Sequence, residues 1–249
     1  MTDYKQFESL SYEDFRRRAK DDTLTRHEKV GFPNSYREGR EELIFEDILR
    51  KLPLLKTENK TVLEVGPGCS KLPFMLIDLC EKQRHELIFV DSPEMLAQLP
   101  DKPFIRKIEG FYPRCPGLFE EYHGRVDVFL SYSVFQMIFI ESNIWEAFDR
   151  SLELLSNGGE MLIGDIPNVS KRKRFFGSER GIEFHREFTG TKEIPEVSFN
   201  NIEHGKIDDA VLLGLLARGR SQGFDVYLVP QSNDLPLANR REDILVRKP

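Results

Sequence analysis

The stretch Val62-Leu63-Glu64-Val65-Gly66-Pro67-Gly68-Cys69-Ser70 decides the fold predicted for this chain. Four residues typical of a buried strand lead directly into a turn with two glycines and a proline, and apolar residues then recur at helical spacing over 72–79. Gly66 and Gly68 lack a Cβ atom, so the backbone can turn sharply and a ligand can lie against it. A strand, a glycine turn and a helix in this order are typical of the first unit of a nucleotide-binding α/β sheet.

Length and composition fit one large α/β domain with an N-terminal addition. The chain has 249 residues and a net charge of −6, which argues against broad, sequence-independent binding of nucleic acid. No apolar run is long enough to span a bilayer, and the polar start Met1–Lys5 lacks a signal-peptide core. The three cysteines, Cys69, Cys80 and Cys115, have no metal-ligand spacing, and we expect a reducing cytoplasm and no bound metal.

Two helices are predicted before the first strand. Ser11 and Asp14 form a capping pattern for a helix that ends near Lys20, and 41–52 carries apolar residues on one helical face. We expect residues 1–59 to form a helical segment that packs across the mouth of the ligand pocket, with residues 60–249 as the main domain.

Strands and helices alternate along the main domain. A helix is expected over 144–155, ended by Asn157-Gly158-Gly159, and another begins at 210–216. The last two strands are joined only by 230–243, too short for a crossover helix, so they should pair antiparallel. The fold class is therefore α/β, a doubly wound and mostly parallel sheet with a terminal antiparallel hairpin, plus N-terminal helices. After the first strand, we predict strands at 87–91, 104–108, 126–130, 160–164, 226–229 and 244–246.

The glycine turn with its preceding acid resembles motif I of the class I S-adenosylmethionine (SAM) methyltransferases. Glu64 lies two residues before the first glycine, and Ser70 occupies the slot where that family often has a third glycine. A dinucleotide-binding fingerprint would need a glycine or alanine where Lys71 stands, which disfavours a NAD-dependent oxidoreductase. The resemblance covers residues 60–249, and it implies a seven-stranded sheet and SAM as the cofactor.

The resemblance also implies roles for individual residues. Gly66 and Gly68 would let the backbone approach the methionine part of SAM, and Glu64 would hold its ammonium group. Asp91 matches the acid that binds both ribose hydroxyls, although it could also cap the helix that follows. The residues implied around the adenine and beneath the methyl group, with Phe111 an equally plausible core residue, are Met95, Glu109, Gly110, Phe111, Ser131 and Tyr132.

A basic stretch lies in a long insertion at about 166–206, between the fifth strand and the next helix. A basic run is usually a solvated face or a nucleic-acid contact. In an acidic protein and beside the expected site, we interpret it as recognition of phosphate on a small acceptor. The residues assigned to this role are Lys171, Arg172, Lys173, Arg174 and Arg180.

Methyl transfer to a weakly acidic hydroxyl needs a base. The candidates are His185, which lies in the basic insertion, Asp165 at the end of a central strand, and His204 in reserve. We expect His185 to be the base, with Asp165 orienting it or the acceptor. Ser131 stands at the first metal position of catechol-type enzymes, so a metal set of that kind is not expected.

Two phrases, 164–168 and 239–245, are also similar to methyltransferases of bacterial surface-carbohydrate clusters. This similarity implies an O-methyltransferase for a capsule or lipopolysaccharide precursor. An RNA methyltransferase and a catalytically silent SAM-binding subunit remain as alternatives. The expected partner is a small anionic molecule rather than nucleic acid or a membrane, and homo-oligomerisation is left open.

Overall fold

The computed structural model describes residue 7 and residues 10–249. The polar stretch Met1–Lys5, on which the absence of a signal peptide was predicted, lies outside the described residues. In the described residues, the N-terminal segment before the sheet includes the helices α1 (Tyr12–Ala19), α2 (Arg26–Lys29), α3 (Asn34–Arg37) and α4 (Glu41–Lys51) and the 3-10 helix η2 (Pro53–Lys56). The capping box predicted at Ser11 and Asp14 is present at the start of α1.

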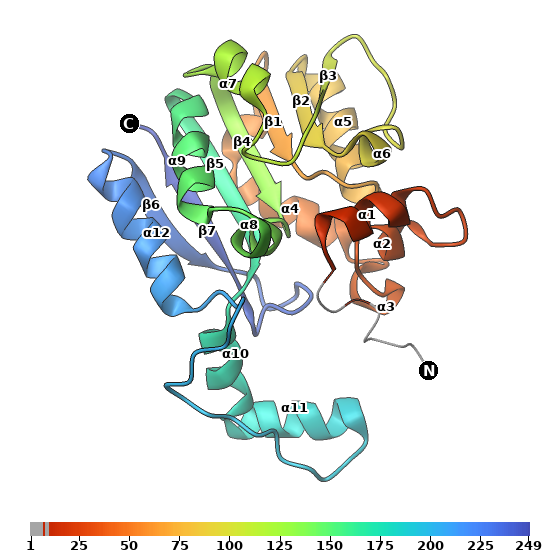
Figure 1. Ribbon diagram of the computed structural model, residues 1–249, viewed down its shortest axis with the longest axis vertical. Coiled ribbons are helices and arrows are strands. Elements are labelled where there is room, and N and C mark those ends of the chain that lie inside the picture. Colours follow the sequence, from red (N-terminus) through yellow and green to blue (C-terminus); the bar gives the residue numbers. More distant parts are fainter. Residues whose placement is uncertain (1–6, 8–9) are drawn as a thin grey trace.

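The remainder of the chain alternates strands and helices as predicted (Figure 1). The strands are β1 (Thr61–Val65), β2 (Glu86–Asp91), β3 (Ile105–Glu109), β4 (Val126–Tyr132), β5 (Leu155–Pro167), β6 (Asp225–Pro230) and β7 (Arg241–Arg247). The helices between them are α5 (Lys71–Gln83), α6 (Pro93–Leu96), α7 (Pro116–Tyr122), α8 (Phe135–Glu141), α9 (Ile144–Leu154), α10 (Val169–Phe176), α11 (Glu179–Thr189) and α12 (Asp209–Ser221).

In the described residues the strands form one seven-stranded sheet in the order β3-β2-β1-β4-β5-β7-β6. Strand β7 runs antiparallel to both of its neighbours, and the other neighbouring pairs are parallel. This arrangement confirms the doubly wound sheet with a terminal antiparallel hairpin. The order reverses between β1 and β4, and in open α/β sheets ligands bind at such a switch point, beyond the carboxyl ends of the strands.

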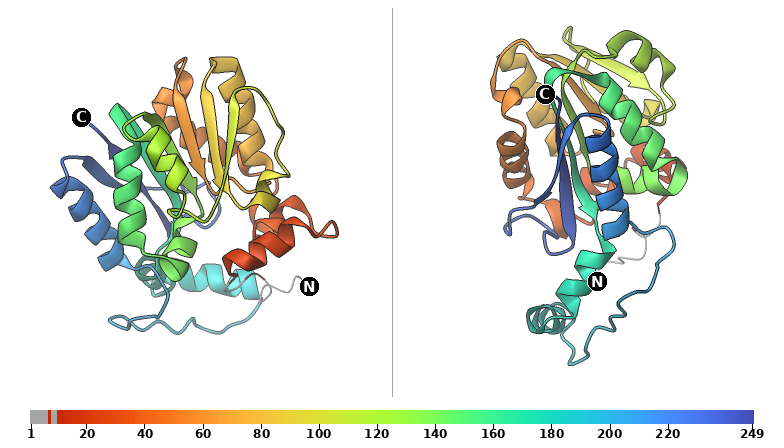
Figure 2. Two further views of the ribbon diagram at one scale, coloured as in Figure 1. Left: turned by 45° about the horizontal axis from the view of Figure 1, so that its top comes forward. Right: turned by 90° about the vertical axis from the view of Figure 1, so that its left-hand side faces the viewer.

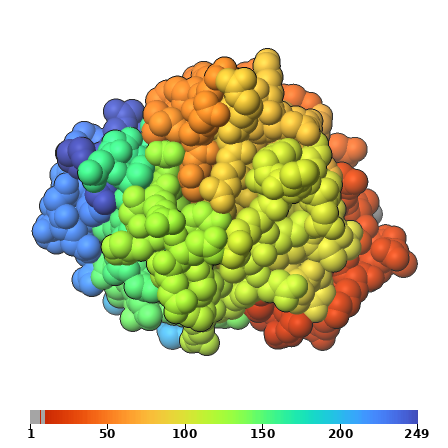
Figure 3. Space-filling view, turned by 90° about the horizontal axis from the view of Figure 1, so that it is seen from above, coloured from red at the N-terminus to blue at the C-terminus, as the bar shows by residue number. Residues whose placement is uncertain are grey.

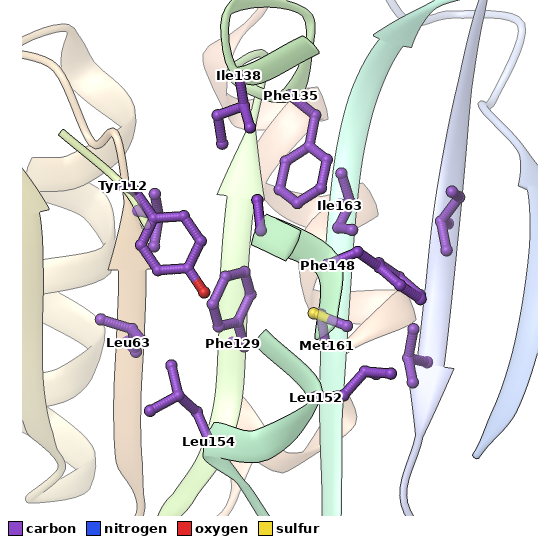
Figure 4. Packing of buried hydrophobic residues seen from close by; sticks show 14 of the residues in the cluster. Leu63, Tyr112, Phe129, Phe135, Ile138, Phe148, Leu152, Leu154, Met161 and Ile163 are labelled. Atoms are coloured by element: carbon purple, nitrogen blue, oxygen red, sulfur yellow. The ribbon is translucent and has the colours of Figure 1, made fainter. Parts of the chain in front are cut away.

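Apolar side chains fill both faces of the sheet. On one face, α7, α8, α9 and α12 pack on a cluster that includes Phe129, Phe148 and Met161, which Figure 4 shows from close by. On the other face, α4, η2 and α5 contribute residues such as Ile48 and Leu76 to a second cluster. Figure 2 shows the two helical layers on either side of the sheet.

The turn Asn157-Gly158-Gly159 does not end a helix, as the sequence had suggested, but lies inside β5. Helix α9 ends at Leu154, and the strand continues from Leu155 through the two glycines. The Gly158 amide donates to the Lys248 carbonyl at 3.1 Å, and the Lys248 amide donates to Gly159 at 2.9 Å. Pairing with the end of the chain therefore holds the glycines in the sheet. A local helix-end signal could not reveal that partner, which lies about ninety positions further along the chain.

Helices α10 and α11 extend beyond the carboxyl ends of the parallel strands, at the bottom of Figure 1. Figure 3 shows the opposite end of the molecule, where orange to green parts of the chain form the middle of the surface, between blue and red parts at its sides. The N-terminal helices α1 and α2 lie at the same end as α10 and α11. Both additions to the sheet thus lie at the end where a ligand is expected.

Candidate cofactor and acceptor site

A cavity of about 640 Å³ lies at the carboxyl ends of β1, β2 and β4. Its volume is in the range of small-molecule sites, 300–1,000 Å³. The wall includes the turn after β1, the end of β2, the turn after β3 and the segment after β4. The remaining wall comes from the N-terminal segment, the start of α10, residues 203–207 and the start of β7.

The glycine turn forms one wall of the cavity with its backbone. Gly66 and Gly68 have φ angles of +70° and +64°, a region that side-chain-bearing residues rarely adopt. A Cβ atom at Gly66 would lie 2.5 Å from Val134 Cγ2, and one at Gly68 would lie 2.6 Å from Val30 Cγ1. The turn therefore needs glycine both for its conformation and for the space beside it.

Two carboxyl groups beside the turn, those of Glu64 and Asp91, line the cavity. Glu64 is buried, and its Oε2 atom has no hydrogen-bond partner within the described part of the chain. Burial, and secondarily the nearby charge of Asp91, raise the pKa of Glu64 to about 8. Burial also raises the pKa of Asp91 to about 6, although the amides of Ser92 and Gly68 donate to its carboxylate at 2.7 and 3.1 Å. Both carboxyl groups are buried, which disfavours their ionised forms, and Glu64 Oε2 has no hydrogen-bond partner. A positively charged ligand would stabilise the ionised forms.

Beyond Asp91, apolar residues line the cavity. They include Met95, Gly110 and Phe111, as the resemblance implied. The Tyr12 ring meets Phe111 edge-on at 4.8 Å, so this part of the cavity has an aromatic wall from the N-terminal segment. Two other residues assigned to the cofactor do not line the cavity. Glu109 is exposed, and Ser131 is fully buried in β4.

The N-terminal segment covers this part of the cavity. The Tyr12 hydroxyl donates to the Gly110 carbonyl at 3.2 Å, and the Tyr12 amide donates to Glu141 Oε1 of α8 at 2.8 Å. Arg16 pairs with Glu94 of α6 at 2.9 Å. Helix α1 is thus fastened at both sides of the cavity, and Phe15 and Val30 add apolar wall between these anchors.

Asp165 is held in a buried polar network and does not line the cavity. Its Oδ2 accepts from an Arg37 guanidinium at 2.9 Å and from the Ser133 hydroxyl. The Asp165 amide donates to Asp243 Oδ1 at 2.8 Å. Asp165 has a φ of +57°, and it lies where the register of the pairing between β5 and β7 shifts. Arg37 and Ser133 do line the cavity, so they separate Asp165 from it.

The basic run is mostly used within the protein. Lys173 pairs with Glu203 at 3.2 Å, Arg174 pairs with Asp209, and the Lys171 ammonium donates to the Arg241 carbonyl at 2.7 Å. These three residues and Arg180 do not line the cavity, and Arg172 does. The cations that surround this end of the cavity are Arg37, Arg172, Lys206, Arg240 and Arg241.

None of the chain's five histidines, all of which are among the described residues, lines the cavity. His185 lies on α11, where its ring meets Phe176 edge-on at 6.2 Å. His204 is exposed, although its neighbours Glu203 and Gly205 line the cavity. Tyr132, the remaining predicted acceptor residue, lies in the wall.

Most of the basic residues at this end of the cavity were not predicted from the sequence. Arg240 and Arg241 lie in the phrase quoted for its similarity to carbohydrate-cluster enzymes, but no role was assigned to them. Lys206 is an isolated lysine, and Arg37 lies in a helix of only four residues, so neither stands out by pattern. These residues are far apart in the sequence, and they lie near one another only in the folded chain, where α3, the 203–207 segment and β7 meet.

Comparison with known proteins defines the fold. No protein-family profile and no curated protein matches the sequence. A SAM-dependent methyltransferase from Aquifex aeolicus has a similar structure, with a TM-score of 0.54, 13% identity and coverage of 88% of this chain and 95% of that one. The CurJ carbon methyltransferase matches with a TM-score of 0.56 and 15% identity, over 98% of this chain and 65% of that one.

A third structure, named as a candidate O-methyltransferase from Nostoc punctiforme, has a TM-score of 0.54 and 12% identity, over 97% of this chain and 62% of that one. The chain thus has the Rossmann-like fold of the class I SAM-dependent methyltransferases. Among the helices of the described residues, none is long and apolar enough to cross a membrane.

Proposed function

We propose that this protein is a SAM-dependent methyltransferase that transfers a methyl group to an oxygen of a small anionic acceptor. The observation that carries the proposal is the charge pattern of one cavity. At one end, Glu64 and Asp91 are buried carboxylates beside the glycine turn. At the other end, Arg172, Arg240 and Arg241 line the wall. A cationic cofactor and an anionic acceptor would each meet the opposite charge.

The residues of the acidic end fit SAM. Its ammonium group would provide the partner that Glu64 Oε2 lacks, and Asp91 would accept from the ribose hydroxyls. The backbone at Gly66 and Gly68 would lie against the methionine part, and the space between Met95 and Phe111 would hold the adenine. When bound, SAM supplies a methyl group on a positively charged sulfur, ready for displacement by a nucleophile.

The protein's contribution is then mainly positioning and exclusion of water. Helix α1 covers the cofactor end, and Tyr132 and Ser133 line the cavity between its two ends. Because no histidine lines the cavity and Asp165 is paired with Arg37, the arrangement favours an acceptor oxygen that is already ionised. A carboxylate or phosphate oxygen needs no protein base at neutral pH.

The acceptor class follows from the basic end. Arg240 is half-buried, and burial lowers its pKa, so an anion beside it would restore a favourable environment for its charge. A phosphorylated, sugar-like metabolite, such as a charged precursor of capsule or lipopolysaccharide, belongs to the acceptors that we propose. We also propose a cytoplasmic location, since Cys69, Cys80 and Cys115 are buried and unbridged.

The test combines SAM binding with transfer. Calorimetry should show that SAM binds, and Asp91→Ala should weaken binding by about 1.5–3 kcal/mol, the range for a hydrogen bond to a charged group. Labelled SAM should then methylate a member of a panel of phosphorylated and carboxylated metabolites. Failure of the unmodified protein to bind SAM would overturn the proposal. SAM binding with no transfer to any small acceptor would instead favour a silent subunit, and steeply salt-dependent transfer to RNA would favour an RNA methyltransferase.

A further inference from the structure

Arg37, the last residue of α3, lies in the cavity wall and is held there by several contacts. Its Nη2 atom donates to Asp165 Oδ2 at 2.9 Å and to the Ser133 hydroxyl. The guanidinium carbon lies 3.7 Å from the centroid of the Phe32 ring, so the ring covers one face of the guanidinium. Within the described residues, the other two nitrogens, Nε and Nη1, have no hydrogen-bond partner. The side chain is therefore fixed in place and still has donors for a ligand.

Two adjacent residues connect Arg37 to the cofactor end of the cavity. Ser133, which accepts from the Arg37 guanidinium, directly follows β4 and precedes Val134. Val134 lies beside the glycine turn, because a Cβ atom at Gly66 would be 2.5 Å from its Cγ2 atom. The backbone at Gly66 is where the methionine part of SAM, which carries the methyl group on its sulfur, is proposed to lie. Arg37 therefore lies close to the proposed point of methyl transfer.

Two other arginines of the cavity wall have different surroundings. The guanidinium carbons of Arg172 and Arg240 lie 5.7 Å and 5.1 Å from the ring centroid of Phe176, the last residue of α10. Phe176 does not line the cavity. Arg172 and Arg240 can thus hold a part of the acceptor that lies toward α10, whereas Arg37 is joined to the segment that contacts the glycine turn.

The charge around Arg37 also suits an anion. Asp165 is shared by two guanidinium groups, that of Arg37 at 2.9 Å and that of Arg241 at 3.8 Å, and both arginines line the cavity. The neighbouring carboxylate of Asp243 is paired with Lys51 at 2.6 Å. One carboxylate therefore faces two cations of the cavity wall, and an anion bound beside Arg37 would balance the second charge.

We propose that Arg37 binds the anionic oxygen of the acceptor that receives the methyl group, and that Asp165 and Ser133 are positioning residues that hold its guanidinium. This inference rests on the proposed function and names the residue at its reactive point. The acceptor oxygen forms a bond to the methyl carbon while the carbon–sulfur bond breaks and its electron pair stays on sulfur. No proton is transferred. The acceptor loses one negative charge and the sulfur its positive charge, so the attraction at Arg37 weakens once the methyl group has been transferred.

Two unreactive analogues of SAM provide the test. S-adenosylhomocysteine has a neutral sulfur, whereas sinefungin carries an ammonium group in place of the methylated sulfonium. The full-length protein is saturated with one analogue or the other and titrated with inorganic phosphate at constant ionic strength. If the anion binds at Arg37, phosphate should bind about tenfold more tightly to the sinefungin complex, because opposite charges a few ångströms apart attract each other.

The unmodified protein alone can contradict the inference. Equal phosphate affinity in the two complexes, or no phosphate binding in either, would overturn it and leave cofactor binding intact. Failure of the protein to bind SAM and both analogues would instead overturn the proposed function, and the inference would fall with it.

Variants of two arginines locate the effect. Arg37→Gln is made alone and together with Asp165→Asn, because loss of the guanidinium alone would leave a buried carboxylate poorly paired. In both proteins the ratio of the two phosphate affinities should fall to about one, since the phosphate no longer lies beside the cofactor's charge. Arg240→Gln should weaken phosphate binding to both complexes by the same factor and keep the ratio. An unchanged ratio in the double variant would overturn the assignment to Arg37.

Lys51→Gln is the matched control for the polar network. Lys51 is a cation of the same network, since it pairs with Asp243, whose other oxygen accepts from the Asp165 amide, but it does not line the cavity. The variant should keep the ratio of phosphate affinities. A loss as large as that in Arg37→Gln would mean that loosening of the network, and not contact of Arg37 with the anion, explains the result, and it would overturn the proposal.

Discussion

The two ends of the cavity differ in charge and in how the chain builds them. The cofactor end is acidic and comes mainly from residues at the ends of β1, β2 and β3. The acceptor end is basic and comes from α3, α10, the 203–207 segment and the start of β7. The carboxyl groups and the glycine turn of the first end belong to the sheet and its turns, although α1 also covers that end, whereas most cations of the second end lie in additions to the sheet.

The largest expected effect is at the cofactor end. Gly66→Ala should weaken SAM binding by about two to three orders of magnitude, because the new Cβ meets Val134 and the backbone has a positive φ. Gly190→Ala is the matched control, since its φ is +68° but no atom lies within 4 Å of the position. Calorimetry should show normal SAM affinity in the control. Equal losses in both variants would mean that backbone strain alone, and not the space beside the turn, explains the result.

Glu64→Gln tests the charge of the same end without changing its shape. We expect SAM affinity to fall about 10- to 150-fold, the effect of losing a hydrogen bond between charged groups, and phosphate binding to stay constant. Glu160→Gln is the control, because Glu160 is another buried carboxylate, which accepts from the Leu54 amide at 2.8 Å and does not line the cavity. An unchanged SAM affinity in Glu64→Gln would contradict the proposed role of the Glu64 charge in cofactor binding.

The pH dependence of SAM binding should reveal the same carboxylate. Glu64 has a pKa of about 8 without ligand, so it must lose a proton to pair with an ammonium group. Affinity should fall about eightfold between pH 7.5 and pH 6.5, with protons released on binding. Titrations in buffers of different ionisation enthalpy measure that release, and Glu64→Gln should abolish it across this interval.

The stability of the ligand-free protein should change in the opposite direction. A carboxyl group with a raised pKa in the folded state holds its proton where the unfolded chain has lost it. Because of Glu64, the free energy of unfolding therefore falls as the pH rises from the ordinary pKa of a glutamate to about 8. Asp91 has the same effect between the ordinary pKa of an aspartate and about pH 6. Urea unfolding at pH 5 and pH 8 should show this loss, and Glu64→Gln should reduce it. A stability that rises over this interval in wild type and variant alike would contradict the assignment.

A smaller effect is expected at the acceptor end. Arg240→Gln should weaken binding of inorganic phosphate about five- to tenfold and leave SAM affinity unchanged, because Arg240 is half-buried in the cavity wall. Arg174→Gln belongs to the same basic surroundings but pairs with Asp209 outside the cavity, and it should leave phosphate affinity intact. If Arg174→Gln has the larger effect, the basic run itself binds the anion, as the sequence suggested.

The smallest effect is expected for His185→Gln. A general base contributes about 10²–10⁴-fold to turnover, but His185 packs on Phe176 outside the cavity lining. We therefore expect a change of less than about twofold in methyl transfer between pH 6 and pH 9. A decrease in the rate of methyl transfer by the factor expected for a general base would instead support the base role predicted for His185 from the sequence. It would also require α11 to move over the acceptor.

The sequence predicted the sheet because its signals are local. Residues 62–70 contain the strand, the turn and the helix start within nine positions, and the short 230–243 connection indicated the antiparallel hairpin. The acceptor end was less predictable, because its contacts join distant positions. Lys173 and Arg174 looked available as a charge run, but Glu203 and Asp209, which neutralise them, lie about thirty residues further on. Arg37 has no distinctive local pattern, and its contact with Asp165 appears only in three dimensions.

The pairing of Arg37 with Asp165 also affects the order in which the protein can form during synthesis. Arg37 leaves the ribosome 128 residues before its partner, and Lys51 leaves it 192 residues before Asp243, to which it donates at 2.6 Å. At about 5–20 residues per second, these delays are roughly 6–40 seconds. During that time the sheet beneath the N-terminal segment is incomplete, because β5 and β7 are missing, and Asp165 and Asp243 are not yet available to pair with Arg37 and Lys51. The first segment to be synthesised should therefore be among the last to reach its final packing. In a nascent chain halted before residue 165, α3 and α4 should be sensitive to protease.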